Sequence, residues 1–129
     1  MPAHTFLNLS NHPVASWSQE QFDAARALDL GEPCDLEGGM PLVPPEASTE
    51  QVVVLAAELV RRAFEQGLWG AHVAGEFTLT SALVREFQWR GVRCFVATTR
   101  RESREVPVAG GGVERHSEFR FVRWREYPC

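Results

Sequence analysis

The sequence predicts a single α/β domain, with a mainly parallel sheet flanked by helices and a C-terminal antiparallel hairpin. The first observation behind this prediction is that short apolar runs of strand character alternate with segments of helical periodicity, as in parallel sheets with helical crossovers. The second is that two extended segments surround three glycines at residues 110–112, which indicates a hairpin. The third is length, because 129 residues suffice for one core and leave little for a second.

The N-terminal third of the chain holds two predicted strands, one helix and one loop. The apolar run at residues 5–9 has the length and composition of a buried strand. A helix over residues 19–30 follows Ser18, whose hydroxyl can cap its first turn. Residues 32–36 are predicted as a second strand, and the glycines and prolines of residues 38–45 indicate a loop.

The middle of the chain carries the clearest helical signals. A capping box beginning at Ser48 opens a segment in which apolar residues recur at helical spacing, and Gly67 ends it. A short strand over residues 70–74 and a third helix over residues 79–90 are predicted next. Residues 92–97 then form a nearly continuous apolar run, which is typical of a strand covered on both faces.

Composition and charge exclude several classes of function. A formal net charge of −4 disfavours a protein that coats long nucleic acid through a basic surface. No apolar run reaches the roughly 20 residues of a membrane span, and the N-terminus lacks the layout of a secretory signal, so we expect a cytoplasmic protein without a membrane partner. The cysteines and histidines lack the spacing of a metal site, and dinucleotide and P-loop motifs are missing, so no metal and no cofactor is predicted.

Polar residues follow three of the predicted strands, at the points where those strands end. The carboxyl ends of parallel strands meet at one edge of an open sheet, and ligands bind at that edge. Hydroxyls, an imidazole, guanidinium groups and the N–H groups of a helix start are suited to hold an anion such as phosphate. The residues are Ser10, Asn11 and His12 after the first strand, Gly75, Glu76, Thr78 and Thr80 after the third, and Thr98, Thr99, Arg100 and Arg101 after the fourth.

Each of these residues also has a plain structural explanation. The segment at residues 10–12 consists of ordinary turn residues. Thr78 can be simply a helix cap, and Glu76 can be a first-turn carboxylate that complements the helix dipole. The two arginines can be a solvated pair on the surface. The common position at three strand ends, more than any single residue, therefore predicts the site. His72 lies inside an apolar strand and is predicted to be a hydrogen-bonded core histidine.

The order of these motifs resembles a known family. A strand ending in N-L-S-N-H-P, a G-E-F-T-L-T segment that opens a helix, and a strand followed by T-T-R-R are similar to features of the small stand-alone proteins of type III CRISPR loci. Those proteins are related to CARF domains, the Rossmann-like sensors of cyclic oligoadenylate. Several of them are ring nucleases, which cut the cyclic messenger and switch off the defence response. The resemblance implies a single CARF-like, Rossmann-like domain over residues 1–129 that pairs as a two-fold homodimer.

The resemblance further implies metal-independent cleavage of a cyclic oligoadenylate, with cyclic tetraadenylate as the expected ring. A ribose 2′-hydroxyl attacks the adjacent phosphate, and the linear product ends in a 2′,3′-cyclic phosphate. His12 would move a proton, Arg100 would stabilise charge on the phosphoryl oxygens, and Ser10 would orient the ligand. The other strand-end residues would bind the ligand, namely Asn11, Gly75, Glu76, Thr78, Thr80, Thr98, Thr99 and Arg101. The absence of a lysine from these loops departs from the family pattern and leaves the catalytic set open.

Two other classes of function remain open at this point. In one, the protein binds the messenger or a nucleotide without cleaving it, as a sensor or sponge. In the other, it is an interaction module, in which Phe119, Phe121, Trp124 and Tyr127 mediate assembly, although such aromatic residues are more often core or dimer contacts. Arginines and glutamates alternate over residues 114–126, and this alternation is the pattern expected of cross-strand ion pairs.

Overall fold

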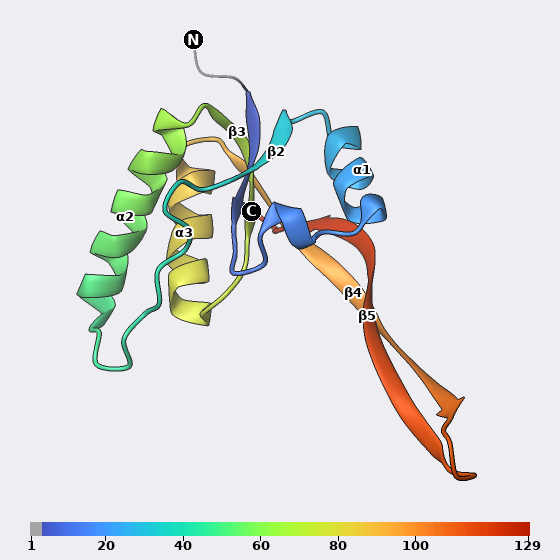
Figure 1. Ribbon diagram of the computed structural model, residues 1–129. Coiled ribbons are helices and arrows are strands. Elements are labelled where there is room, and N and C mark those ends of the chain that lie inside the picture. The colour runs from blue at the N-terminus through green and yellow to red at the C-terminus, as the bar shows by residue number, and fades with distance from the viewer. Residues whose placement is uncertain (1–3) are drawn as a thin grey trace.

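The computed structural model describes residues 4–129, which form a mixed α/β fold with one sheet (Figure 1). Its strands are β1 (Thr5–Leu9), β2 (Glu32–Asp35), β3 (Leu68–Val73), β4 (Arg93–Pro107) and β5 (Val113–Glu126). Its α-helices are α1 (Gln19–Ala27), α2 (Thr49–Glu65) and α3 (Phe77–Trp89), and a short helical turn, η1 (Val14–Ser16), precedes α1. Among residues 4–129, no helix combines the length and the apolar character needed to cross a bilayer.

The strands lie in the order β2-β1-β3-β4-β5. The pairs β1–β2, β1–β3 and β3–β4 are parallel, whereas β5 runs antiparallel to β4. The predicted mainly parallel sheet with an antiparallel C-terminal hairpin is therefore confirmed. The chain moves from β1 to β2 on one side and then crosses to β3 on the other, so the strand order reverses between β1 and β3.

Neighbouring residues of β1 belong to two different cores, because side chains of a strand alternate between the faces of a sheet. Leu7 is part of the larger cluster, which includes Leu59 of α2 and apolar residues of α3. Phe6 is part of a smaller aromatic cluster that contains Trp17 and Trp124 and against which α1 packs. The rings of Phe6 and Trp124 meet edge to face with centroids 5.1 Å apart, a favourable aromatic geometry.

The serine caps predicted for the first two helices are confirmed. The Ser18 hydroxyl accepts from the Gln21 backbone N–H at 3.2 Å, and the Ser48 hydroxyl accepts from the Gln51 N–H at 3.2 Å. The Gln51 side chain in turn accepts from the Ser48 N–H at 2.8 Å, so α2 begins with a complete capping box. These bonds satisfy N–H groups that have no partner inside the helix.

The helix α1 ends at Ala27, whereas the sequence pattern predicts that it ends at Leu30. Asp29 adopts a left-handed backbone conformation with φ of 59°, which cannot continue a right-handed helix. Gly31 follows with φ of 102°, and a Cβ at this position would lie 2.4 Å from the carbonyl oxygen of His4. The turn between α1 and β2 therefore needs a glycine to bring β2 alongside β1.

The largest departure from the predicted fold concerns β4. The sequence predicts a strand over residues 92–97 followed by a loop, but β4 runs without interruption from Arg93 to Pro107. It pairs with β5 from Phe95 to Pro107, with a single register shift between Thr98 and Thr99. The predicted loop is wrong because each of its polar residues has a backbone partner on β5, and that partner is remote in sequence.

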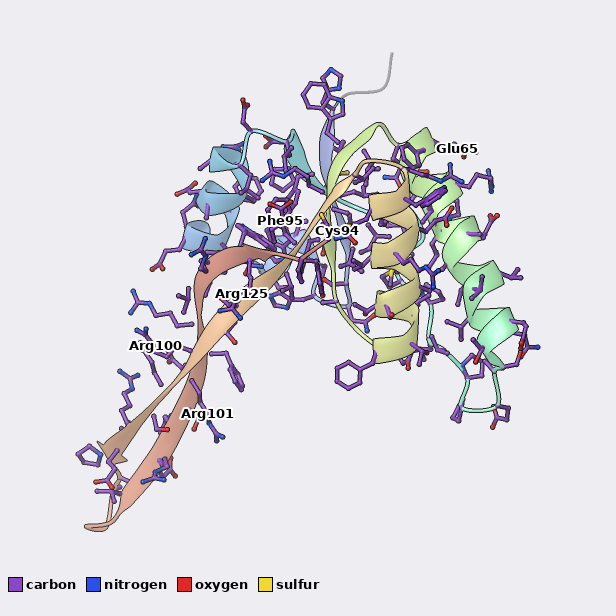
Figure 2. The ribbon with its side chains drawn as sticks, turned by 180° about the vertical axis from the view of Figure 1, so that it is seen from behind. Glu65, Cys94, Phe95, Arg100, Arg101 and Arg125 are labelled. Atoms are coloured by element: carbon purple, nitrogen blue, oxygen red, sulfur yellow. The ribbon has the colours of Figure 1, made fainter. Side chains whose placement is uncertain are left out.

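The outer parts of β4 and β5 leave the body of the domain as a long two-stranded arm, here defined as residues 99–120 (Figure 1). Residues 99–105 and 113–120 of this arm are all exposed. Figure 2 shows Arg100 and Arg101 on the arm, away from the core residues Cys94 and Phe95. The arm therefore adds little to either core.

Candidate functional site

The segment that follows β1 is held in place by Asn8, a buried residue of that strand. The Asn8 amide nitrogen donates to the Asp35 carboxylate at the end of β2 and to the His12 carbonyl, both at 2.9 Å. The Asn8 amide oxygen accepts from the Ser10 hydroxyl at 2.7 Å and lies 2.9 Å from Nδ1 of His72 on β3. One buried amide thus ties together three strands and the loop, and it fixes the backbone at residues 10–12.

His72 is the buried titratable member of this network, with 3% of its surface exposed. Because the Asn8 oxygen only accepts, Nδ1 carries the proton and donates to it. The rings of Trp17 and Trp124 pack against the imidazole, with centroids 5.9 Å and 4.8 Å away. Burial, and to a lesser extent repulsion from His12, lowers the pKa of His72 to about 4. The prediction of a hydrogen-bonded core histidine is confirmed.

An open cavity of about 900 Å³ lies at the carboxyl ends of β1 and β3, beside the start of α1 and the base of the arm. This is the edge of the sheet at which the strand order reverses, where open parallel sheets bind ligands. The residues predicted from strand ends that line it are Ser10, Asn11, His12, Gly75 and Thr99. The structure therefore brings together part of the predicted set.

The residues predicted at the start of the third helix do not line this cavity. The Glu76 carboxylate caps α3, accepting from the N–H groups of Thr78 and Leu79 at 3.1 Å and 2.8 Å. The Thr78 hydroxyl donates to the same carboxylate at 2.6 Å, and this bond is the largest of the effects that lower the pKa of Glu76. The prediction of Thr78 as the cap is wrong, because the carboxylate already satisfies both N–H groups. The helix N-terminus that was expected to hold a bound anion is occupied by Glu76.

Thr80 lies one turn into α3, and its buried hydroxyl oxygen has no hydrogen-bond partner among the described residues. Its side chain is outside the cavity lining. The structure therefore does not bring Thr80 to the predicted binding set, because it lies on α3, which begins at Phe77.

The four residues predicted in the loop after the fourth strand lie within β4, and they separate there. Thr99 lines the cavity, whereas Thr98, Arg100 and Arg101 do not. The Thr98 hydroxyl donates across the ribbon to a β5 carbonyl at 3.0 Å, and the Arg101 guanidinium donates to the Ser117 hydroxyl at 3.3 Å. Figure 2 shows Arg100 and Arg101 on the arm, outside the body of the domain. The continuation of β4 removes both arginines from the predicted edge.

Two polar contacts of the site were not predicted from the sequence. The first is the Asn8–Asp35 bond, for which the signal was a polar residue inside the apolar run at residues 5–9. The second is the bond between two residues of the cavity lining, in which the Arg120 guanidinium donates to the Glu20 carboxylate at 3.0 Å. This bond raises the pKa of Arg120 above its ordinary value. No local pattern joins residues so distant in the chain.

A family model described as "Uncharacterized protein MJ1673 family" matches residues 4–125. The chain belongs to the MJ1673 family. No curated protein and no solved structure matched the chain. The matched region begins before β1 and ends within β5, so the cavity and the arm both lie inside the part that this chain shares with the MJ1673 family.

The cavity of this MJ1673-family chain offers a mixed chemistry. The rings of Phe119 and Phe121 provide flat apolar faces on which a nucleobase can stack, and the hydroxyls of the β1 loop and α1 start suit a sugar. Glu20, Glu102 and Glu118 also line it, and they oppose the binding of a free phosphate. Within residues 4–129, no three histidine, cysteine or acidic side chains are placed to hold a metal ion.

Proposed function

We propose that the protein is a ring nuclease that binds and cleaves a cyclic oligoadenylate in this cavity, with cyclic tetraadenylate as the first ring to test. In this proposal the domain is a Rossmann-like relative of CARF domains, with helices on both faces of its sheet, and it works as a homodimer. The observation that carries the proposal is the convergence of Ser10, Asn11, His12, Gly75 and Thr99 on one cavity at the sheet edge. Small-molecule sites commonly measure about 300–1,000 Å³, and this cavity lies in the upper part of that range.

The reaction that fits these groups is an internal transesterification. The ribose 2′-hydroxyl gives up its proton as its oxygen attacks the neighbouring phosphorus, the bond from phosphorus to the 5′-oxygen breaks, and the leaving oxygen takes up a proton. His12 is exposed toward the cavity and is the group that accepts or returns this proton. Its backbone carbonyl accepts from the Asn8 amide and from the Trp17 indole at 2.9 Å and 3.0 Å, so its position is defined by the fold.

Ser10 and Arg100 take different roles from those that the sequence suggested. The Ser10 hydroxyl donates to Asn8 and accepts from the His12 N–H at 3.2 Å, so we assign it the positioning of His12. Arg100 lies on the arm outside the cavity, and Arg120 takes its place as the donor to the phosphoryl oxygens. One guanidinium N–H of Arg120 donates to Glu20 in the structure, so this carboxylate partly offsets the charge that Arg120 brings to the site.

A second function is favoured by the same Arg120–Glu20 contact. Arg120 is the one arginine among the described residues that line the cavity, and its charge is already compensated. A site with a neutralised arginine and further carboxylates can hold a nucleotide by stacking and sugar contacts without stabilising a phosphoryl transition state. The protein would then be a sensor or sponge for the messenger.

The deciding experiment incubates the purified protein with cyclic oligoadenylates of several ring sizes in excess chelator. Chromatography and mass analysis of the products distinguish a linear oligoadenylate with a 2′,3′-cyclic phosphate from an intact ring. The variant His12→Ala is expected to cleave about 10²–10⁴-fold more slowly, which is the usual contribution of a general acid or base. Its matched control is His4→Ala, which removes an exposed imidazole outside both the cavity lining and the arm.

Each outcome decides between the two functions. Cleavage by the wild type and by His4→Ala, with loss in His12→Ala, supports the nuclease. A ring that binds and is recovered intact supports the sensor or sponge. Undiminished cleavage by His12→Ala removes His12 from the mechanism, and rings that neither bind nor react remove both functions.

A further inference from the structure

Within the described part of the chain, the arm makes one side-chain hydrogen bond to the body, from Arg120 at its base to Glu20. A two-stranded ribbon is only marginally stable in water when neither face is covered. Residues 99–105 and 113–120 expose their side chains along both strands, and both outer edges are unpaired. The arm therefore offers its faces and edges to another molecule.

One face of the arm carries charge in rows, and we name it the striped face. A row is a pair of residues that lie directly opposite each other on β4 and β5, and alternate rows of an antiparallel ladder share a face. From the body outwards, the rows of the striped face are Arg100 with Arg120, Glu102 with Glu118, Arg104 with His116, and Val106 with Glu114. Their signs alternate as positive, negative, positive and negative.

The rows of the striped face pair like with like, so the predicted cross-strand ion pairs do not form on this face. Elsewhere in the two strands the prediction holds, because the Arg93 guanidinium pairs with the Glu126 carboxylate at 2.9 Å and Glu105 lies opposite Arg115. Arg100 faces Arg120 and Glu102 faces Glu118, and directly opposed like charges destabilise a sheet. Opposite charges are available only diagonally, at the larger separation of about 7–8 Å. Arg120 is partly compensated by Glu20. The arm by itself thus leaves favourable charge contacts unmade.

The sequence of rows is complementary to itself. Consider a two-fold axis that lies in the plane of the contact, parallel to the rows and midway between the second and third rows. Rotation about this axis places a second copy face to face with the first and reverses the order of its rows. Each positive row of one copy then meets a negative row of the other, at both inner and both outer positions. Rows that are two residues apart along a strand are separated by about 6.8 Å, so the spacing is the same on both copies.

We propose that the striped face is a docking surface for a second copy of this chain, which lies antiparallel on it in a two-fold dimer. In this arrangement Glu102 contacts Arg104 of the other copy, and Glu118 contacts His116. The outer rows bring Arg120 against Glu114, with Arg100 beside them. His116 lies 3.2 Å from Glu114 within the chain, so Arg104 supplies the positive charge of its row. The contact is isologous, so each pair occurs twice.

Glu102, Glu118 and Arg120 of the striped face also line the cavity, so a second copy on this face lies against the cavity. The proposal rests on the order of charges along the arm and needs neither ligand binding nor cleavage in the cavity. The opposite face of the arm shows no such order, because it carries Arg101 opposite Phe119 and Ser103 opposite Ser117. Charge complementarity therefore selects the striped face for the contact. The same complementarity identifies the occupant as a second copy of the chain. The order of charges that fits the striped face is the reversed order of the striped face itself.

The test uses two charge-reversal variants of the full chain, studied by sedimentation velocity at about 0.15 M salt. The first is Glu102→Arg with Glu118→Arg, and the second is Arg104→Glu with His116→Glu. In each variant alone, the second and third rows carry the same sign and repel each other in the dimer. We expect self-association to weaken by about a hundredfold or more in each, relative to wild type.

An equimolar mixture of the two variants restores opposite signs at both inner contacts, so the mixture is expected to form a heterodimer as tight as the wild-type dimer. The matched control is the swap Glu105→Arg with Arg115→Glu, a directly opposed pair on the other face, which is expected to dimerise as wild type. Circular dichroism verifies the fold of each chain. The proposal would be overturned if the wild type is monomeric, if either variant alone dimerises as tightly as the wild type, or if the mixture of the two variants stays monomeric.

Discussion

At the scale of single residues, the pair of Asn8 and His72 makes the stability of the fold depend on pH. The fold lowers the pKa of His72 from 6.5 to about 4, so the unfolded chain binds a proton more readily than the folded one between these values. Stability is therefore fully present above about pH 6.5 and falls as the pH drops toward 4. The loss amounts to about 3 kcal/mol at most, at about 1.4 kcal/mol for each pH unit.

Urea unfolding at intervals between pH 5 and 6.5 tests this dependence. The range excludes the carboxylates with lowered pKa values, Glu58, Glu76 and Glu126, whose ordinary pKa of 4.5 places their losses of stability at lower pH. The variant His72→Gln is expected to flatten the curve, because it keeps a donor for Asn8 and cannot titrate in this range. His4→Gln serves as the control at an exposed histidine away from the arm. A flat curve for the wild type would contradict the argument.

The residue scale also shows what a sequence can and cannot reveal about the site. His72 was recognised as a core residue from its apolar neighbours alone, because burial of a strand follows from local pattern. The loop at residues 10–12 was predicted to face a cavity, and it does. The role of Asn8 was not foreseen, because its partners come from β2, β3 and the loop, and only folding brings them together.

At the scale of elements, the sequence predicts those helix starts that are fixed by hydrogen bonds between residues close in sequence. The caps at Ser18 and Ser48 rest on bonds to residues three positions away, and the structure has both. The extent of β4 depends on β5, and the polar residues at 98–101 look like a loop until that strand is placed beside them. The long-range partner, and not the local composition, decides the element.

The connection between α1 and β2 is expected to be the least tolerant turn of the fold. Gly31 combines φ of 102° with a Cβ position 2.4 Å from the His4 carbonyl oxygen, so Gly31→Ala requires the backbone of β1 to shift. A loss of about 2–4 kcal/mol in the free energy of unfolding is expected, from strain and overpacking together.

Gly39→Ala is the matched control for this substitution. Gly39 also has a positive φ, of 72°, but nothing lies within 4 Å of the Cβ that the substitution adds. Only the conformational strain remains, at about 1 kcal/mol. Urea denaturation of the two variants measures both effects. Equal losses would show that the close approach to β1 is not what constrains Gly31.

At the scale of the whole molecule, the cavity and the arm share the same two strands. The base of the arm supplies Thr99, Phe119 and Arg120 to the cavity, while its outer part is exposed on both faces. A contact made by the outer arm therefore reaches the cavity through a continuous ladder of backbone hydrogen bonds. The body and the outer arm are nevertheless separable in energy, because the two cores contain no residue beyond Phe121 toward the tip.

This separation predicts the effect of shortening the arm. Replacing residues 103–117 by Asn-Gly joins Glu102 to Glu118 through a two-residue hairpin turn and keeps every residue that lines the cavity. The free energy of unfolding of the monomer is expected to change by less than about 1 kcal/mol, because the removed side chains are largely exposed. Self-association is expected to be lost, because two of the four rows of the striped face are removed with them. Denaturation and sedimentation of the shortened chain measure the two effects separately. A shortened chain that dimerises like the wild type would assign the dimer contact to the body, and one that loses several kcal/mol would make the outer arm part of the fold.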